Sequence, residues 1–266
     1  MPLVDLNGTL GESFGTWQKG MDEAMLRIVS SASMACGMHA GDPLVMQTTV
    51  ASARRVGACI GAEIGYPDLQ GYGQRDLSMN PYEIYVYSLY QIGALTAMCR
   101  ANGVRLDYVK PHGALYRRAC QELAVAKSIA RAIRDTDKDV ILVGALGSVV
   151  EEAAAGNGIP FVGEVFADRG YREDGTLIPK GERGDVVSNP AIAAERVLRL
   201  LQQSTPSVEN TSDGTKPLTI GIHGDYPNAT KVAFAVKEAL EVNGFTIAGL
   251  RSLVYITNTL DKEQAP

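Results

Sequence analysis

Residues Val140 to Val165 read VILVGALGSVVEEAAAGNGIPFVGEV, two short apolar runs on either side of a segment with helical periodicity. Short apolar runs bounded by glycine or proline are typical of buried strands. The segment between them, Val149–Gly156, predicts a helix. These residues therefore predict a strand–helix–strand unit, which joins two parallel strands.

The same alternation recurs along nearly the whole chain and places it in the α/β class. Predicted strands are Leu3–Leu6, Ser33–Cys36, Ala58–Ala62, Tyr108–Lys110, Val140–Val143, Phe161–Val165, Leu218–Ile222 and Thr246–Ala248. Predicted helices are Met21–Val29, Pro43–Val56, Pro81–Asn102, Glu122–Arg134, Val149–Gly156, Pro190–Gln203 and Asn228–Asn243. We expect residues 1–266 to form one domain, and periodicity alone fits either a closed parallel β/α barrel or an open parallel sheet.

Three helix starts carry recognisable capping chemistry. In each, an Asp or Asn side chain precedes a proline at the first helical position, as in Asp42-Pro43, Asn80-Pro81 and Asn189-Pro190. Glycine follows predicted helix ends, where a left-handed residue is commonly required, at Gly103, Gly158 and Gly244.

Composition favours a protein that handles a small molecule. The 25 basic and 30 acidic residues give a net charge of −5, which offers no basic field for nucleic acid or an anionic membrane. The four cysteines form no CxxC pair, so neither a zinc knuckle nor a disulfide framework is indicated. The sequence shows no signal-like start and no apolar run of about 18 residues. We therefore expect a cytoplasmic protein with no membrane or nucleic-acid partner.

Two stretches interrupt the alternation. Asp168–Asn189 is rich in charge and glycine and is long for a connection, so it is either a lid over a site or a plain surface loop. Residues 204–216 are rich in Ser, Thr, Asn and Gly and predict a flexible insertion.

Polar side chains gather at the predicted strand ends. All three histidines lie in stretches crowded with Gly, Pro and acids, which suits a ligand or proton carrier on a loop better than a packing role. Because the carboxyl ends of parallel strands meet in space, the residues at these ends should share one mouth. The set comprises Asp5, Asn7, His39, Glu63, Lys110, His112, Glu164, Asp168, His223 and Asp225.

Each candidate has a structural alternative. Asp5 and Asn7 alternate on one strand face, which suits a metal ligand or a substrate clamp, or equally an Asx turn. Lys110 and His112 flank a proline, where mutual repulsion would lower the pKa of one or both and suit proton transfer or oxyanion binding. Alternatively, Lys110 pairs with a structural carboxylate such as Glu164.

Two weaker patterns stand apart. The tyrosines at 82, 85, 87 and 90 have helical spacing, and we expect them to pack in the core. Residues Gly144–Ser148 follow a strand and open a helix, so they could cradle a phosphate or carboxylate, although no Walker lysine is present.

The polar blocks, taken in order, resemble the LamB/YcsF family over about residues 4 to 250. The resemblance is carried by Val4–Asn7 with Leu10–Gly15, Ala35–Pro43, Gly65–Leu69, Tyr90–Leu95, Lys110–Tyr116, Glu164–Arg169 and His223–Asp225. It implies a distorted β/α barrel akin to the polysaccharide deacetylases. It also implies ATP-dependent opening of the 5-oxoproline lactam to glutamate, together with two further subunits of B and C type.

The chain departs from the family pattern twice. The family usually reads Asp-Leu-Asn-Cys-Asp-Leu-Gly-Glu near the start, and here Gly8-Thr9 replace Cys-Asp. It usually reads Gly-Ala-His-Pro-Gly-Tyr-Pro, and here Glu63-Ile64 replace His-Pro. An acid and a histidine are thus missing. The step they serve is either lost or rebuilt with Glu63, since a carboxylate can replace imidazole as a ligand for harder ions.

Our first hypothesis is an amide or lactam hydrolase. His39 or Glu63 would activate water, Lys110 would stabilise the oxyanion and His112 would protonate the leaving nitrogen, in a catalytic set of Asp5, His39, Lys110 and His112. Substrate contacts are predicted for Asn7, Glu63, Glu164, Asp168, Arg169, His223 and Asp225. A divalent metal would bind Asp5, His39 and Glu63, and ATP would act only through partner subunits.

Two alternatives stay open. A diverged homologue could catalyse an acid–base isomerisation, cyclisation or lyase reaction on another cyclic or carbonyl substrate. A non-catalytic subunit could bind a ligand or scaffold a complex. In each case we expect a homo-oligomer.

Overall fold

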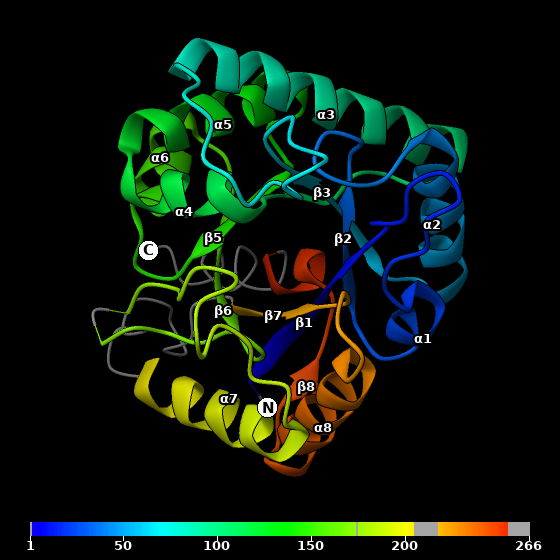
Figure 1. Cartoon of the computed structure of the whole chain (residues 1–266), viewed down its shortest axis with the longest axis vertical. Helices are drawn as coiled ribbons and strands as arrows, with labels where there is room; N and C mark the ends of the chain where they lie inside the picture. Colours follow the sequence, from blue (N-terminus) through cyan, green and yellow to red (C-terminus); the bar gives the residue numbers. More distant parts are fainter. Residues whose placement is uncertain (1, 174, 205–217, 255–266) are drawn as a thin grey trace, which may run out of the picture.

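The computed structural model describes residues 2–173, 175–204 and 218–254, and its centre is a closed barrel of seven parallel strands (Figure 1). Each strand pairs with the next, and the last pairs with the first. The strands are β1 (Leu3–Leu10), β2 (Ser31–Ala35), β3 (Cys59–Ile64), β4 (Tyr108–Pro111), β5 (Ile141–Ala145), β6 (Phe161–Phe166) and β7 (Leu218–His223). The predicted β/α barrel is therefore confirmed, and it is closed.

The eighth predicted strand lies outside the ring. Strand β8 (Thr246–Ile247) pairs only with the start of β1, because β1 pairs with β2 and β7 over the rest of its length. The chain then turns under the barrel, where Leu250 and Leu253 pack against interior side chains including Tyr108. This apolar plug closes the amino-end mouth of the strands, so the other mouth is the one available for chemistry.

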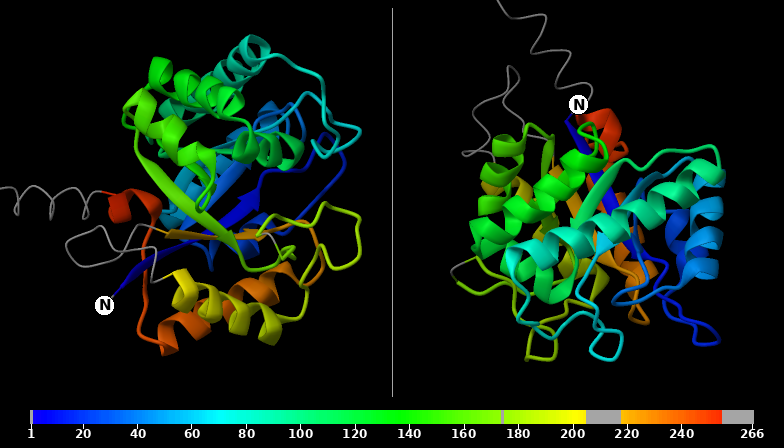
Figure 2. Two further views of the ribbon diagram at one scale, coloured as in Figure 1. Left: turned by 90° about the vertical axis from the view of Figure 1, so that its left-hand side faces the viewer. Right: turned by 90° about the horizontal axis from the view of Figure 1, so that it is seen from above.

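Helices surround the barrel, as the views in Figure 2 show. They are α1 (Asp22–Leu26), α2 (Pro43–Val56), α3 (Pro81–Ala101), α4 (Gly113–Gln121), α5 (Leu123–Thr136), α6 (Val149–Asn157), α7 (Pro190–Ser204) and α8 (Ala229–Val242). The side chains of Asp42, Asn80 and Asn189 accept backbone N–H bonds as predicted. Gly103, Gly158 and Gly244 all have positive φ, so the predicted helix ends are confirmed.

Three details differ from prediction. Strand β1 continues four residues beyond Leu6, because Asn7 and Thr9 point into a polar barrel interior and interrupt the apolar pattern without ending the strand. Helix α4 was not predicted, since it directly follows β4 and precedes α5 with one residue between them. The core placement of the α3 tyrosines is wrong for Tyr82, Tyr87 and Tyr90, which are 70%, 37% and 63% exposed.

None of the described helices is both long and apolar enough to cross a lipid bilayer. The segment 168–189 is described except for residue 174, and it lies between β6 and α7. Most of the predicted insertion at 204–216 lies outside the described residues.

One close approach inside the barrel is allowed only by glycine. The ring of Tyr108 lies flat over Gly61 on the neighbouring strand, where a Cβ atom would overlap it. The Tyr108 hydroxyl is held by Ser33 and Asn7 at 3.1 Å each. This tyrosine therefore fills the barrel centre between the apolar plug and the polar mouth.

We predict that Gly61→Ala lowers the free energy of unfolding by about 3 kcal/mol or more, because the tyrosine ring has no space to move away from the added methyl. Urea unfolding monitored by circular dichroism measures the change. Gly93→Ala is the control: its Cβ would meet nothing within 4 Å on exposed α3, so we expect a gain of about 0.5–1 kcal/mol. Equal stability of the two variants would contradict this account.

Candidate functional site

Two histidines and a glutamate meet at the carboxyl ends of β2, β3 and β4. His39 follows β2, Glu63 lies near the end of β3, and His112 caps α4 directly after β4. The nitrogen and oxygen atoms that they offer all lie within 4.8 Å of one another, and all three residues are buried. We call these three residues the His–Glu–His cluster.

His39 contributes an unprotonated ring to this cluster. Its imidazole stacks on that of His112, with ring centres 4.0 Å apart and planes 8° from parallel. Burial, followed by the proximity of His112, lowers the pKa of His39 to about 4. Within the described part of the chain, neither nitrogen of His39 has a hydrogen-bond partner, although Nε2 lies 3.8 Å from Glu63 Oε2. The ring is neutral and available as a ligand.

His112 makes contacts through both ring nitrogens. Nε2 lies 3.0 Å from the backbone oxygen of Tyr72 and 3.3 Å from the side-chain nitrogen of Gln74. Nδ1 faces Glu63 Oε1 at 3.6 Å. Because Glu63 is negatively charged, a cation placed between this carboxylate and the imidazole would be stabilised.

Glu63 is ionised despite its burial. Burial raises the pKa of this carboxyl, but His112, His39 and Lys110 outweigh that effect and hold the pKa well below its usual range. Its Oε1 accepts a 3.1 Å bond from the Thr9 hydroxyl, and its Oε2 has no hydrogen-bond partner among the described residues. One oxygen is therefore oriented by Thr9 and the other is free to bind.

Lys110 lies beside the cluster as a fully buried cation. Its Nζ donates to Glu164 Oε1 at 2.9 Å and lies 3.9 Å from Glu63 Oε1. Burial lowers the pKa of Lys110, but the surrounding acids more than offset this and raise it above its usual value. The expected lowering of the pKa of Lys110 by His112 is therefore wrong. The ion pair with Glu164 is confirmed.

A second imidazole–carboxylate pair closes the other side of the mouth. Asp168 Oδ2 accepts the backbone N–H of His223 at 2.7 Å, and Oδ1 lies 3.1 Å from its Nδ1. The His223 ring also stacks on Phe166, with centres 5.2 Å apart. Asp168 thus fixes the orientation of His223, which leaves Nε2 as the nitrogen for proton transfer.

Asp5 is not part of the His–Glu–His cluster. It pairs with Thr219 on β7, whereas Thr9, four residues further along β1, pairs with His223 at the mouth. Its carboxylate accepts bonds of 2.6–2.7 Å from Ser30, Ser31 and Thr219. The expectation that Asp5 lies at a strand end came from placing the end of β1 too early.

The remaining predicted residues take three different positions. Asn7 is also deep in the barrel, where its Oδ1 binds Ser33 and Tyr108. Asp225 lies above the mouth, paired with Lys180 and with Lys19. Arg169 lines the mouth, and its guanidinium donates to backbone oxygens of the 168–189 segment.

Tyr72 covers the His–Glu–His cluster and was not found from sequence. Its ring meets those of His112 and His39 edge-on, at 5.3 and 6.2 Å between centres. The ammonium groups of Lys19 and Lys180 lie over the Tyr72 ring, 3.8 and 4.9 Å from its centre. Its φ of 55° is unusual for a residue other than glycine. Only this backbone strain marks it, and strain leaves no sequence signal.

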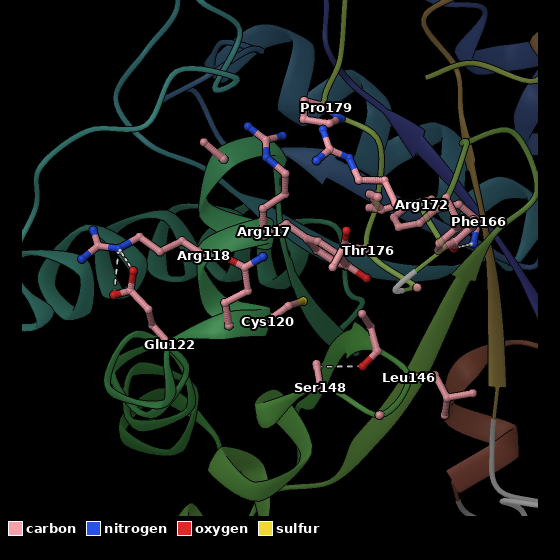
Figure 3. Close-up of a pocket in the computed structure, with 18 of the residues that line it drawn as sticks. Arg117, Arg118, Cys120, Glu122, Leu146, Ser148, Phe166, Arg172, Thr176 and Pro179 are labelled. Carbon is pink, nitrogen blue, oxygen red and sulfur yellow. Dashed lines mark hydrogen bonds and ion pairs between the residues drawn. The ribbon is translucent and has the colours of Figure 1, made fainter. Parts of the chain in front are cut away.

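Two cavities adjoin these residues. A small one of about 20 Å³ is lined by Glu63, Lys110, His112, His223, Arg117 and Arg169, among others. A larger one of about 600 Å³ lies beside it, between α4, the start of α6 and the segment around Thr176 (Figure 3). The glycine-rich residues 145–148 line the larger cavity, away from the cluster.

The chain is thus a closed parallel β/α barrel with buried histidine, carboxylate and lysine side chains at its carboxyl-end mouth. The fold is similar to that of the peptidoglycan deacetylase PdaC from Bacillus subtilis, with a TM-score of 0.51 at 13% identity over 99% of this chain and 95% of that one. Within this class, the chain belongs to the LamB/YcsF family, whose model matches residues 4–254.

Relatives within the family are much more similar. The A subunit of 5-oxoprolinase from Pyrococcus abyssi is 42% identical over 252 residues, which cover 94% of this chain and 99% of that protein. The corresponding A subunit from Symbiobacterium thermophilum is 42% identical and covers 92% and 94%. The crystal structure of a lactam utilization protein from Thermus thermophilus has a TM-score of 0.82 at 41% identity, over 94% of this chain and all of that one.

We predict that Asp5→Asn changes the pH dependence of stability. Burial raises the pKa of Asp5 to about 6, and hydrogen bonds from Ser31, Thr219 and Ser30 offset this only in part. The folded state therefore binds the Asp5 proton more tightly than the unfolded chain does. This proton adds to the free energy of unfolding at low pH, and its contribution is lost as the pH rises through 6. Relative to wild type, Asp5→Asn should gain roughly 3 kcal/mol between pH 4 and 7.5.

Urea unfolding of both proteins at the two pH values measures this difference. Asp135→Asn is the control, because hydrogen bonds to Arg134 and Tyr85 lower the pKa of this surface carboxyl. Any change in that variant should have the opposite sign. A constant difference between Asp5→Asn and wild type across pH would show that Asp5 is not held protonated.

Proposed function

We propose that this chain is a lactam hydrolase that acts as the A-type subunit of an ATP-dependent 5-oxoprolinase and opens 5-oxoproline to glutamate. The observation that supports it most is the buried ammonium of Lys110 beside the His–Glu–His cluster. An amide is a poor electrophile, and a fixed cation in a water-poor site is the means of stabilising the oxyanion that forms when it is attacked. The names of the 42% identical relatives give the substrate.

The roles follow from the contacts. Water loses a proton to His39 or Glu63 as its oxygen bonds to the ring carbonyl carbon, while Lys110 donates to the carbonyl oxygen, on which negative charge develops. The carbon–nitrogen bond then breaks, and the nitrogen takes a proton. We assign this proton to His223 in place of His112, because both ring nitrogens of His112 are directed to Tyr72 and Glu63, whereas His223 is held by Asp168.

The His–Glu–His cluster also fits a divalent cation. Two neutral or deprotonated imidazole nitrogens and a carboxylate are the ligands of many catalytic zinc sites. The unpartnered His39 nitrogens and Glu63 Oε2, and His112 Nδ1 at 3.6 Å from Glu63 Oε1, provide donor atoms for such an ion. A bound cation would lower the pKa of water. We place it on His39, Glu63 and His112, with Asp5 excluded.

ATP enters this proposal only through partner subunits. The relatives are named as the A component of 5-oxoprolinase. We propose that partners of B and C type transfer the terminal phosphoryl group of ATP to the lactam oxygen, where Lys110 faces its negative charge. After water has added to the ring carbon and the carbon–nitrogen bond has broken, the phosphoryl group leaves as inorganic phosphate. The 168–189 segment, which contributes Arg169 and Leu177 to the small cavity, is proposed as the lid that admits the substrate.

We predict that Lys110→Met combined with Glu164→Gln lowers glutamate formation by roughly 10²–10³, the effect of losing one oxyanion donor. The second substitution is included because Lys110→Met alone would leave a buried carboxylate unpaired. The assay measures glutamate from 5-oxoproline and ATP with the partner subunits present. Lys231→Met on exposed α8 is the control and should retain full turnover. Unchanged turnover by a folded double variant would refute the role of Lys110.

We predict that the chelator-treated protein binds one Zn²⁺ per chain, measured by isothermal titration calorimetry. His39→Ala and Glu63→Gln should each weaken binding at least about tenfold, because each removes one of three ligands. Asp5→Asn should bind as wild type does. Loss of binding in Asp5→Asn with retention in Glu63→Gln would place the cation deeper in the barrel.

A further inference from the structure

Two guanidinium groups face the small cavity without an acid beside them. Arg117 comes from α4 and Arg169 from the segment after β6. Arg117 donates to the side-chain and backbone oxygens of Gln74, at 3.1 and 3.0 Å. Arg169, only 6% exposed, donates to the backbone oxygens of Asp185 and Ile178, at 2.9 and 2.7 Å. All these partners are neutral, and neither arginine forms an ion pair with any described residue.

Two other arginines, which line the larger cavity, do form ion pairs with acids. Arg118, next to Arg117 on α4, pairs with Glu122 at 3.0 Å, and Arg172 pairs with Glu182 at 2.9 Å. Figure 3 shows Arg117 extending toward the loop that carries Pro179, while Arg118 turns away to Glu122. The unpaired arginines are thus the two that line the small cavity beside Lys110.

Arg169 is buried and Arg117 is half-buried. A cation away from water without a counter-charge is costly, and two cations that lie close repel each other. Burial lowers the pKa of Arg117, and the charge of Arg169 lowers it further, while Asp76 acts weakly in the opposite direction. The acid that lines the small cavity, Glu63, is already engaged with Thr9 and the histidines. An anion bound between the two guanidiniums would remove this cost.

Arg117 also stands where the two cavities adjoin. Tyr116, Arg117, Phe166 and Leu177 line both of them. A ligand that reaches the His–Glu–His cluster from the larger cavity therefore passes the Arg117 side chain. The planar fork of arginine matches a carboxylate, with two parallel N–H bonds.

We propose that Arg117 and Arg169 bind a free carboxylate of the substrate and so restrict the site to cyclic amides that carry an acid beside the ring nitrogen. This inference rests on the proposed lactam chemistry and adds the residues that select within it. In 5-oxoproline the carboxylate and the lactam carbonyl flank the ring nitrogen. A carboxylate held at Arg117 thus directs the carbonyl to Lys110 and the nitrogen to His223.

The test compares 5-oxoproline with its carboxamide, which has the same ring and no charge. Dissociation constants for both are measured by calorimetry with the assembled complex, for wild type, Arg117→Gln, Arg117→Lys and Arg199→Gln. We expect wild type to prefer the acid, Arg117→Gln to reduce this preference at least tenfold, and Arg117→Lys to restore part of it. Arg199→Gln should behave as wild type does, because Arg199 is an exposed arginine on α7 that pairs with Glu195 and lines neither cavity. In turnover, Arg117→Gln should raise KM for the acid more than it lowers kcat.

The outcomes separate this inference from the proposed reaction. If the complex makes no glutamate but the acid preference still depends on Arg117, the carboxylate site stands and the reaction is refuted. If glutamate is made and the preference is equal in wild type and Arg117→Gln, the reaction stands and the carboxylate site is refuted. Displacement of both ligands by inorganic phosphate, without an acid preference, would assign the arginines to a phosphoryl group and overturn the inference.

Discussion

A buried ammonium between two carboxylates organises the mouth of this barrel. Lys110 on β4 bonds to Glu164 on β6 and faces Glu63 on β3, so three strands contribute charge to one enclosed point. Removing any one member would leave an uncompensated charge away from water, which costs more than the pair itself contributes. The position of Lys110 is therefore fixed by electrostatics as well as by the β ladder. The histidines, Thr9 and the roof residue Tyr72 are arranged around it.

Much of this could be predicted from the sequence, because its signals were local. Capping chemistry set the starts of α2, α3 and α7, and glycines set the ends of several helices. The convergence of His39, Glu63, Lys110 and His112 followed from the rule that parallel strands end at one mouth. Each of these inferences needed only the residue type and its distance from the nearest strand end.

The rest depended on information that the sequence does not carry. The depth of Asp5 in the barrel depends on where β1 ends. The barrel interior is polar there, so the inward-facing residues of β1 are of types that also occur in loops, and the sequence does not mark the end of the strand. Tyr72 covers the cluster from a loop whose path no periodicity describes. Arg117 lies on α4, a helix that the sequence pattern does not predict. In all three cases the sequence does not show where the residue lies along the barrel axis or above its mouth. Tertiary packing sets that position.

The two departures from the family pattern touch each other. Thr9 replaces the acid on β1 and Glu63 replaces the histidine on β3, and the Thr9 hydroxyl bonds to the Glu63 carboxylate. Where the family pattern has an acid and a histidine, this chain has a hydroxyl and a carboxylate that bond to each other, so one carboxylate remains but on the third strand instead of the first. Relative to that pattern, the mouth has one imidazole fewer, while His39 and His112 are both present. A site that had lost its chemistry would have no need to keep the carboxylate charge, so the two substitutions are better explained as one rearrangement than as two losses.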